Sequence, residues 1–274
     1  QATVDEIPLV WYEPEGLEKR QLVIWLAGFS WDKDTGIREA ETIAKAGFIV
    51  LSFDPDQHGD RMDNTVEELR ERVRNNIRRY FWPILANTTK ETPKIIDWAI
   101  KNLSVEEKIG MGGVSMGGDI AVAAAGEDKR ITAVSAMIAT PDWLRPGSFE
   151  SPGKPDKNAQ AYYNQYNPLT HLENYVHCPA ISFQSGADDQ QVPPDGGLRF
   201  AEALSEIYVD CSDKIEVVLQ GEELDVGAIG DKAKPKAIAQ GEETLQDVVV
   251  TGKLNGAAIA EMGHHAQSTV HGSF

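Results

Sequence analysis

The sequence predicts an α/β protein in which helices cover both faces of a central, mostly parallel sheet. Three observations support this fold class. Short apolar runs, typical of buried strands, alternate along the chain with helical patterns. The 274 residues are enough for one large domain. The content of 41% hydrophobic and 25% charged residues is typical of a globular protein with a sizeable core. We therefore expect a single domain over 1–274.

The first half of the chain supplies two strands and three helices. Apolar runs at 21–26 and 48–53 predict buried strands, and the segment 34–48 between them predicts a helix. In 64–81, apolar residues recur at steps of three and four, and Asn64 or Thr65 is a suitable N-cap. Residues 92–103 predict another helix, with Pro93 in its first turn.

The second half continues the alternation. The sequence predicts a strand at 108–114, a helix from about Met116, further strands at 131–138, 180–185 and 214–219, and a helix at 196–208. Consecutive strands joined by helices are typical of parallel pairing, because a parallel connection must cross from one end of the sheet to the other.

Two segments interrupt this alternation. Residues 141–178 hold scattered aromatic residues among Pro, Gly and Asn, and we expect a small lid over the sheet. Trp143, Tyr162 and Tyr163 are candidates for a substrate pocket, and the alternative is that they pack the insertion against the core. Residues 220–262 are an atypical insertion rich in Gly, Ala, Lys and Glu, and its stretch "DVVVTG" is a second candidate for the last strand.

A serine lies between glycines at the junction of a predicted strand and a predicted helix. Ser115 has Gly113 two residues before it and Gly117 two residues after it. The Gly-x-Ser-x-Gly pattern in this context is typical of a nucleophile elbow, where small residues relieve clashes in a sharp turn. The alternative is a glycine-rich turn that binds phosphate, but neither of the usual phosphate-loop spacings is present.

A nucleophilic serine requires a base, and the base requires an acid that orients it. The loop "SGADDQQVP" follows a predicted strand and offers Asp188 and Asp189, and "GHH" near the end of the sequence offers His264 and His265. The order Ser, Asp, His matches the order expected for this architecture. The alternatives are a solvated turn for the acids and a polar surface loop for the histidines.

Composition limits the classes of partner. The net charge of −17 disfavours binding to phosphate backbones, so we expect no nucleic-acid partner. No apolar stretch is long enough to span a bilayer, so we expect no membrane partner. The histidines lack metal-ligand spacing, and no cofactor is implied. Without a signal-peptide pattern we expect a cytoplasmic protein, although a start at Gln1 leaves a mature secreted chain as an alternative.

Taken together, these motifs resemble those of the α/β-hydrolase superfamily, especially small bacterial esterases near the dienelactone-hydrolase and prolyl-oligopeptidase-like groups. The resemblance covers about residues 20–219 and resumes at "GHH". It implies Ser115 as the nucleophile, Asp189 as the acid and His264 as the base, with Asp188 and His265 as possible substitutes. The segment "LAGFS" resembles the family's oxyanion loop, which implies that the backbone N–H groups of Phe29 and Met116 bind the oxyanion.

The sequence departs from the family pattern at two places. Ala27 replaces the usual histidine of the oxyanion loop, and a backbone donor does not need that side chain. About forty residues separate the last predicted strand from "GHH", where the family has only a few.

The resemblance implies a serine esterase that cleaves short- to medium-chain carboxylic esters of small molecules through an acyl-enzyme. One alternative is a small serine peptidase, amidase or acyltransferase, and another is a hydrolase-fold binding protein without turnover.

Overall fold

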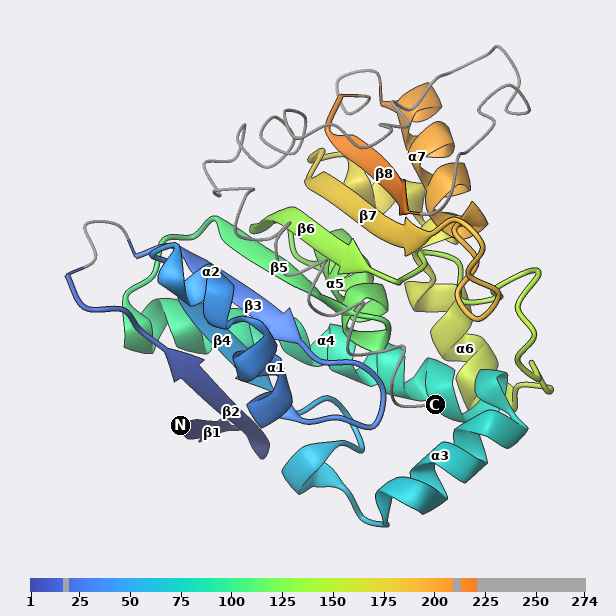
Figure 1. The fold of residues 1–274 in the computed structure, drawn as a ribbon, viewed down its shortest axis with the longest axis horizontal. Helices are drawn as coiled ribbons and strands as arrows, with labels where there is room; N and C mark the ends of the chain where they lie inside the picture. The colour runs from blue at the N-terminus through green and yellow to red at the C-terminus, as the bar shows by residue number, and fades with distance from the viewer. Residues whose placement is uncertain (17–19, 209–212, 221–274) are drawn as a thin grey trace.

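A computed structural model describes residues 1–16, 20–208 and 213–220. Within these residues, eight strands form one sheet in the order β1-β2-β4-β3-β5-β6-β7-β8 (Figure 1). The pairs from β4 to β8 are all parallel, whereas β1–β2 and β2–β4 are antiparallel. The strands are β1 (Ala2–Val4), β2 (Ile7–Tyr12), β3 (Leu22–Leu26), β4 (Ile49–Phe53), β5 (Ile109–Val114), β6 (Ile131–Met137), β7 (Ala180–Gly186) and β8 (Ile215–Gln220).

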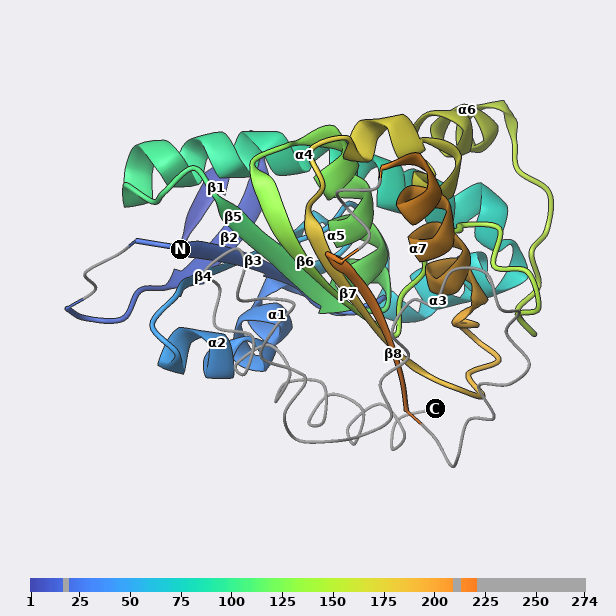
Figure 2. The same ribbon diagram turned by 90° about the horizontal axis from the view of Figure 1, so that it is seen from above.

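Helices cover both faces of this sheet. Figure 2 shows α1 and α2 on one face and α4, α5, α6 and α7 on the other. The α-helices are α1 (Lys33–Glu39), α2 (Glu41–Lys45), α3 (Val66–Asn75), α4 (Ile77–Leu103), α5 (Met116–Glu127), α6 (Lys157–Tyr166) and α7 (Asp195–Ile207). In the described part of the chain, three short 3₁₀ helices also occur, at Gly59–Arg61, Pro168–Thr170 and Leu172–Tyr175. The predicted fold class is therefore confirmed.

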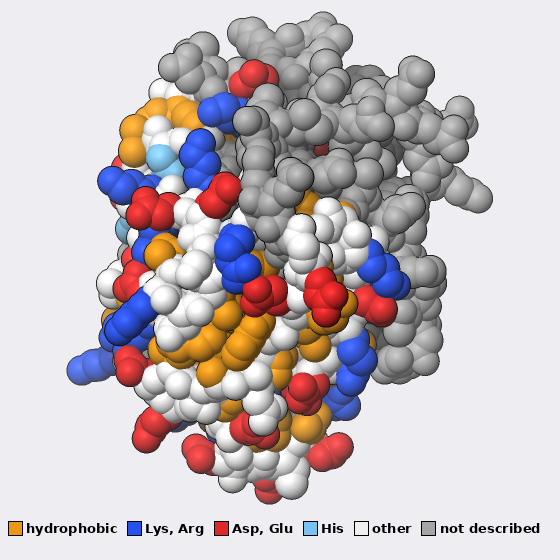
Figure 3. All heavy atoms as spheres, turned by 90° about the vertical axis from the view of Figure 1, so that its left-hand side faces the viewer, with side chains coloured by type: hydrophobic (Ala, Val, Ile, Leu, Met, Phe, Trp, Pro, Cys, Tyr) orange, Lys and Arg blue, Asp and Glu red, His pale blue; other side chains and the backbone are white. Residues whose placement is uncertain are grey.

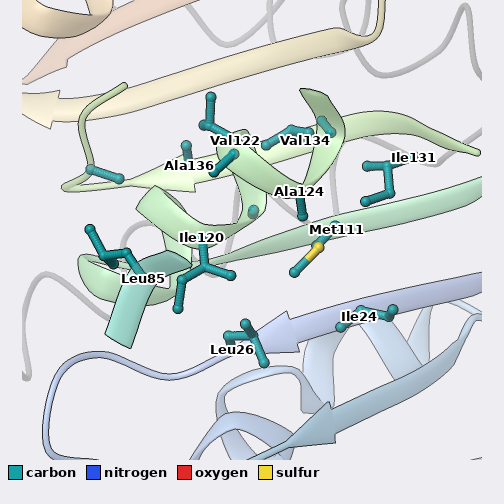
Figure 4. Packing of buried hydrophobic residues seen from close by; sticks show 14 of the residues in the cluster. Ile24, Leu26, Leu85, Met111, Ile120, Val122, Ala124, Ile131, Val134 and Ala136 are labelled. Carbon is teal, nitrogen blue, oxygen red and sulfur yellow. The ribbon is translucent and has the colours of Figure 1, made fainter. Parts of the chain in front are cut away.

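Alternation along the strands builds two cores. In β3, Leu22, Ile24 and Leu26 belong to the larger cluster, under α3 to α7. Val23 and Trp25 belong to the smaller cluster, with α2. Because successive strand residues point to opposite faces, a fully apolar strand buries both faces. Figure 4 shows the larger cluster, where Ile120 of α5 and Leu85 of α4 lie near Leu26 at the end of β3.

Charged side chains of both signs are interspersed on the surface. The face in Figure 3 shows Lys and Arg among Asp and Glu, with hydrophobic side chains between them. No helix within the described ranges has the length and apolar character needed to cross a bilayer.

The helices between β4 and β5 differ from the prediction. The expected helix 64–81 ends at Asn75, and the expected helix 92–103 is the second half of a continuous α4. Asn76 has an extended backbone (φ −161°). Its side chain accepts a hydrogen bond from Arg79 N and donates one to Lys154 O. The helix is therefore interrupted where residues 152–154 pack against it, although the apolar periodicity continues through the interruption. Pro93 lies inside α4 and not in the first turn of a separate helix, and Ile95 and Ile96 after it are buried.

A hairpin and a helix of the described residues were not anticipated from the sequence. The hairpin of β1 and β2 extends the sheet beyond β4 in antiparallel pairing. Helix α6 lies within the segment 141–178 and packs against α4. Its N-cap Asp156 accepts a hydrogen bond from Ala159 N at 2.9 Å. Strand β8 ends at Gln220, so the atypical segment 220–262, including "DVVVTG", lies almost entirely outside the described residues.

Candidate active site

Ser115 lies in the turn between β5 and α5, at the carboxyl edge of the parallel strands. It is half-buried, with φ 51° and ψ −114°. A positive φ is strained for a residue with a side chain, and such strain in a tight turn is frequently found at functional sites. Its N–H donates to Met137 O of the neighbouring β6 at 2.7 Å. The Ser115 side chain makes no capping hydrogen bond to the N-terminus of α5. The turn has the sharp strand-to-helix form expected of a nucleophile elbow.

The glycines on either side of Ser115 are required by packing. A Cβ on Gly113 would lie 2.7 Å from the carbonyl carbon of Gly117, and a Cβ on Gly117 would lie closer than 3.0 Å to Leu26 O of β3. Real Cβ atoms do not approach backbone atoms so closely. The glycines thus relieve clashes in this turn, as the sequence predicts, and the clashes would be with the backbone of the turn and of β3.

The predicted oxyanion loop lies beside the elbow. It follows β3, which pairs directly with β5. A Cβ built on Gly28 would lie 4.0 Å from the Ser115 Cβ, which places the loop against the serine. Met116 is the first residue of α5, so its N–H has no acceptor within the helix. Phe29 is half-buried, and Ala27, which stands in place of the family's histidine, is buried.

The Phe29 ring is enclosed by two other rings. It makes edge contacts with His58 and Phe81, each with a centroid separation of 5.5 Å. His58 is fully buried, and burial lowers the pKa of its imidazole. Its Nδ1 lies 2.8 Å from Asp56 O. These contacts hold the side chain of the residue whose N–H is the first oxyanion donor candidate.

The predicted acid loop follows β7 at the same edge of the sheet. Asp189 is half-buried, and its Oδ1 accepts hydrogen bonds from Gln191 N at 2.8 Å and Val192 N at 2.9 Å. The second oxygen, Oδ2, has no hydrogen-bond partner among the described residues. Asp188 is exposed. The loop thus holds the carboxylate of Asp189 by one oxygen and leaves the other for a donor such as an imidazole N–H.

The predicted base residues, His264 and His265, lie outside the described residues. Of the histidines within them, His58 is buried beside Phe29 as given above. His171 contacts Glu173 at 3.0 Å and Asn164 O at 2.6 Å, and His177 is half-buried next to the 3₁₀ helix Leu172–Tyr175. Among the residues that the structure describes, no group of three His, Cys, Asp or Glu side chains is arranged to hold a metal ion.

Comparisons with known proteins agree with this architecture. Residues 85–220 match the Prolyl oligopeptidase family. Esterase YjfP of Escherichia coli (strain K12) is 28% identical, over 73% of this chain and 82% of its own length. The structure of TT1662 from Thermus thermophilus superposes with a TM-score of 0.64 at 20% identity, over 81% of this chain and 87% of that one. Est1E of Butyrivibrio proteoclasticus, solved with ferulic acid bound, gives a TM-score of 0.53 at 19% identity, over 79% and 87%.

The chain has the α/β-hydrolase fold. In an α/β-hydrolase the nucleophile, the oxyanion donors and the acid come from loops that follow different strands. Here the predicted nucleophile, oxyanion and acid loops follow β5, β3 and β7, respectively.

The aromatic pocket candidates pack against the larger core cluster. Trp143 is buried, and its carbonyl oxygen accepts a hydrogen bond from Trp82 Nε1 at 2.9 Å. Tyr163 stacks on Trp82 with a centroid separation of 4.6 Å, and Tyr162 lies 6.3 Å from Tyr166. These contacts favour the alternative in which the segment 141–178 is packed against the core through α4.

Two buried ion pairs flank the elbow, and neither was anticipated from the sequence. On the oxyanion side, the buried Asp54 accepts from the backbone N–H of Lys33 at 2.9 Å and from its Nζ at 3.2 Å. The same Nζ donates to Asp60 at 2.8 Å, and Asp60 N donates to Asp54 at 2.9 Å. These bonds fix the residue at which the oxyanion loop enters α1.

On the other side, Asp119 lies one turn after Ser115 in α5, and it is fully buried. Its carboxylate accepts from Thr140 N at 2.7 Å and from Arg145 Nη2 at 2.7 Å. The sequence does not show that Asp119 is buried, and a buried aspartate is almost always paired. The partner was not visible, because Arg145 lies in the irregular segment after β6.

Proposed function

We propose that this α/β-hydrolase is a serine hydrolase of carboxylic esters. The observation that carries the proposal is the strained half-buried Ser115, at the N-terminus of α5 and flanked by glycines that no larger residue can replace. The positive φ of Ser115 strains the backbone, and such strain is typical of a nucleophile presented at a helix N-terminus. The relative named esterase YjfP supports ester hydrolysis over other chemistry on the same fold.

In the proposed mechanism, Ser115 Oγ attacks the ester carbonyl. His264 removes its proton and later donates that proton to the leaving alcohol. Asp189 uses its remaining oxygen to hold the imidazole in the correct tautomer and to stabilise the imidazolium. The N–H groups of Phe29 and Met116 bind the oxyanion, and loss of one such donor costs about 3 kcal/mol in comparable sites. Water then hydrolyses the acyl-enzyme.

The proposed substrates are short- to medium-chain esters of small molecules. A second candidate activity is peptide or amide cleavage, which the match of residues 85–220 to the Prolyl oligopeptidase family favours. The same serine, acid and base would serve both reactions, so a pair of acyl-matched ester and amide substrates separates them by their ratio of kcat/KM.

The test uses p-nitrophenyl acetate hydrolysis together with labelling by a fluorophosphonate. We expect the unsubstituted chain to turn over and to label, and Ser115→Ala to lose both, with a rate at least about 10³-fold lower. Ser135→Ala is the matched control, because its buried hydroxyl in β6 has no partner among the described residues and lies outside the proposed site. An unsubstituted chain that neither turns over nor labels would contradict the proposal and leave the binding-protein alternative.

Paired variants assign the acid and the base. We expect His264→Ala and Asp189→Asn each to lower kcat by about 10⁴-fold, whereas His265→Ala and Asp188→Asn stay near the rate of the unsubstituted chain. The value of kcat/KM should rise with pH as the imidazole of the proposed base, His264, loses its proton, because only the neutral form acts as a base. Equal losses in both histidine variants, or none, would remove this assignment of the base.

A further inference from the structure

A continuous set of polar contacts joins the helix of Ser115 to the loop of Asp189. It begins at Asp119, whose N–H donates to Ser115 O at 2.9 Å within the first turn of α5. The Asp119 carboxylate binds Arg145 Nη2 at 2.7 Å, and Arg145 Nη1 binds Glu150 Oε2 at 3.1 Å. Arg145 therefore bridges two carboxylates with the two ends of one guanidinium group.

The set continues from Glu150 into the acid loop. Gln191 Nε2 donates to Glu150 Oε1 at 3.0 Å, and the backbone N–H of the same glutamine donates to Asp189 Oδ1 at 2.8 Å. Two further bonds join the segments, from Phe149 N to Gln190 O at 3.0 Å and from Ser148 Oγ to Gln191 O at 2.8 Å. We refer to Asp119, Arg145, Glu150, Gln191 and Asp189 as the relay.

We propose that Arg145 is a positioning residue that fixes the acid loop 186–192 against the nucleophile helix α5, a role that rests on the proposed function. An arginine suits this role because its planar fork binds two carboxylates at once and stays charged when desolvated. Its side chain is only 8% exposed, beside an Asp119 that is 0% exposed, so water does not screen this pair.

Two further observations indicate that the chain is arranged around this side chain. Arg145 has a φ of 46°, a left-handed conformation that costs free energy for a residue with a Cβ. Its guanidinium also lies 5.1 Å from the centroid of the Phe81 ring, which contacts Phe29 on the oxyanion side. Arg145 thus contacts, directly or through one neighbour, all three loops of the candidate site.

The first test variant is Glu150→Gln. A glutamine has the same shape but no charge, so it loses the charge-assisted bond to Arg145, and it keeps a bond to Gln191 only if one of the two amides turns over. Arg145 keeps its pair with Asp119, so the substitution does not leave a buried charge unpaired. Gln191→Ala removes the next contact, and Gln190→Ala is the matched control, since Gln190 is exposed and takes part through its backbone oxygen alone.

We expect Glu150→Gln and Gln191→Ala to lower kcat for p-nitrophenyl acetate by about 10- to 100-fold with little change in KM, because a small displacement of the acid acts on the transition state. Gln190→Ala should stay within about twofold of the unsubstituted chain. In an Asp189→Asn background, neither relay substitution should lower kcat further, because the group that the relay positions is already lost. A contribution to stability alone would not produce that dependence on Asp189.

Hydrogen exchange of peptide 186–192 gives a readout that does not need activity. The amides of Gln191 and Val192 should exchange about tenfold faster in Glu150→Gln, since their acceptor is no longer held, and Gln190→Ala should not change the protection at Val192. Unchanged exchange in Glu150→Gln overturns the relay, and so does an unchanged kcat when the unsubstituted chain is active. If that chain has no activity, the proposed function fails while the exchange experiment still decides on the relay.

Discussion

The elbow of Ser115 and the loop of Asp189 lie at the same edge of the sheet but are held by different interactions. The elbow is fixed by the backbone, because Gly113 and Gly117 leave no room for a methyl group against Leu26. The acid loop has room: a Cβ on Gly186 would lie an ordinary 3.6 Å from the Asp189 Cβ. Its position depends instead on polar contacts that reach Arg145. Close packing fixes a position by repulsion, whereas a polar network fixes it only while every partner is present.

The oxyanion loop combines both kinds of constraint. Its side chain Phe29 packs between two rings, while its exit into α1 is tied to the buried Asp54 through Lys33. Each side of the elbow therefore has a buried aspartate that pairs with a buried cation. The two cations differ in the segments that they join, since Lys33 joins the start of α1 to the segment after β4, whereas Arg145 joins α5 to the segment that contacts the acid loop.

The largest effect should come from crowding the elbow. Gly117→Ala should prevent stable folding, a loss of more than about 5 kcal/mol, because the new methyl meets the Leu26 carbonyl and neither backbone can move. Gly186→Ala is the matched change in the acid loop and should stay within about 1 kcal/mol. Urea unfolding followed by circular dichroism measures both. A soluble Gly117→Ala chain of normal stability would break the comparison.

The next effect concerns the buried pair on the oxyanion side. Lys33→Met should destabilise the fold by about 3–5 kcal/mol, because it leaves Asp54, which is 0% exposed, without its cation. Lys45→Met removes an exposed pair with Glu41 and should cost about 0.5 kcal/mol or less. The free energies of unfolding at pH 7 give the difference, and equal losses in the two variants would contradict the importance of burial here.

A smaller effect should appear as pH dependence on this flank. Burial raises the pKa of Glu39, at the end of α1, to about 7, against an opposing hydrogen bond from Trp25 Nε1. The folded state therefore keeps a proton that the unfolded state releases above pH 4.5. The stability from this group is fully present below pH 4.5 and is lost as pH rises to about 7.

Glu39→Gln should remove this pH dependence. Relative to the unsubstituted chain, its free energy of unfolding should increase by up to about 3 kcal/mol between pH 4.5 and pH 8. Glu41→Gln, an exposed neighbour in α2, should show a flat difference over the same range. Urea titrations at several pH values, followed by circular dichroism, provide the comparison, and a flat difference for Glu39→Gln would be the contrary result.

The sequence was informative wherever the signal was local. The strands from β3 to β8 are short apolar runs, and each was predicted to within one or two residues because burial on both faces leaves a continuous pattern. The elbow was also local, since its glycines stand two residues from Ser115. The pattern failed at Asn76, where the apolar period continues although a docked segment breaks the helix.

Contacts between distant segments carried no such signal. Lys33 and Asp54 are 21 residues apart, and Asp119 and Arg145 are 26 apart. A charged residue in the sequence is exposed in most proteins, so only the fold shows which of them is buried and with which partner. The same limit explains the aromatic residues of 141–178, whose scatter was compatible with a pocket as well as with packing. His264 and His265 remain predictions.

The order of the strands has a consequence for synthesis of the chain. From β3 onward, β5, β6, β7 and β8 are added one beside the next in chain order. A growing chain can therefore extend its sheet in one direction, with the nucleophile turn in place before the acid loop has been made. At that stage Asp119 has no Arg145 to pair with. The later segment after β6 thus completes both the folding of the core and the assembly of the candidate site, and a chain interrupted before it would lack both.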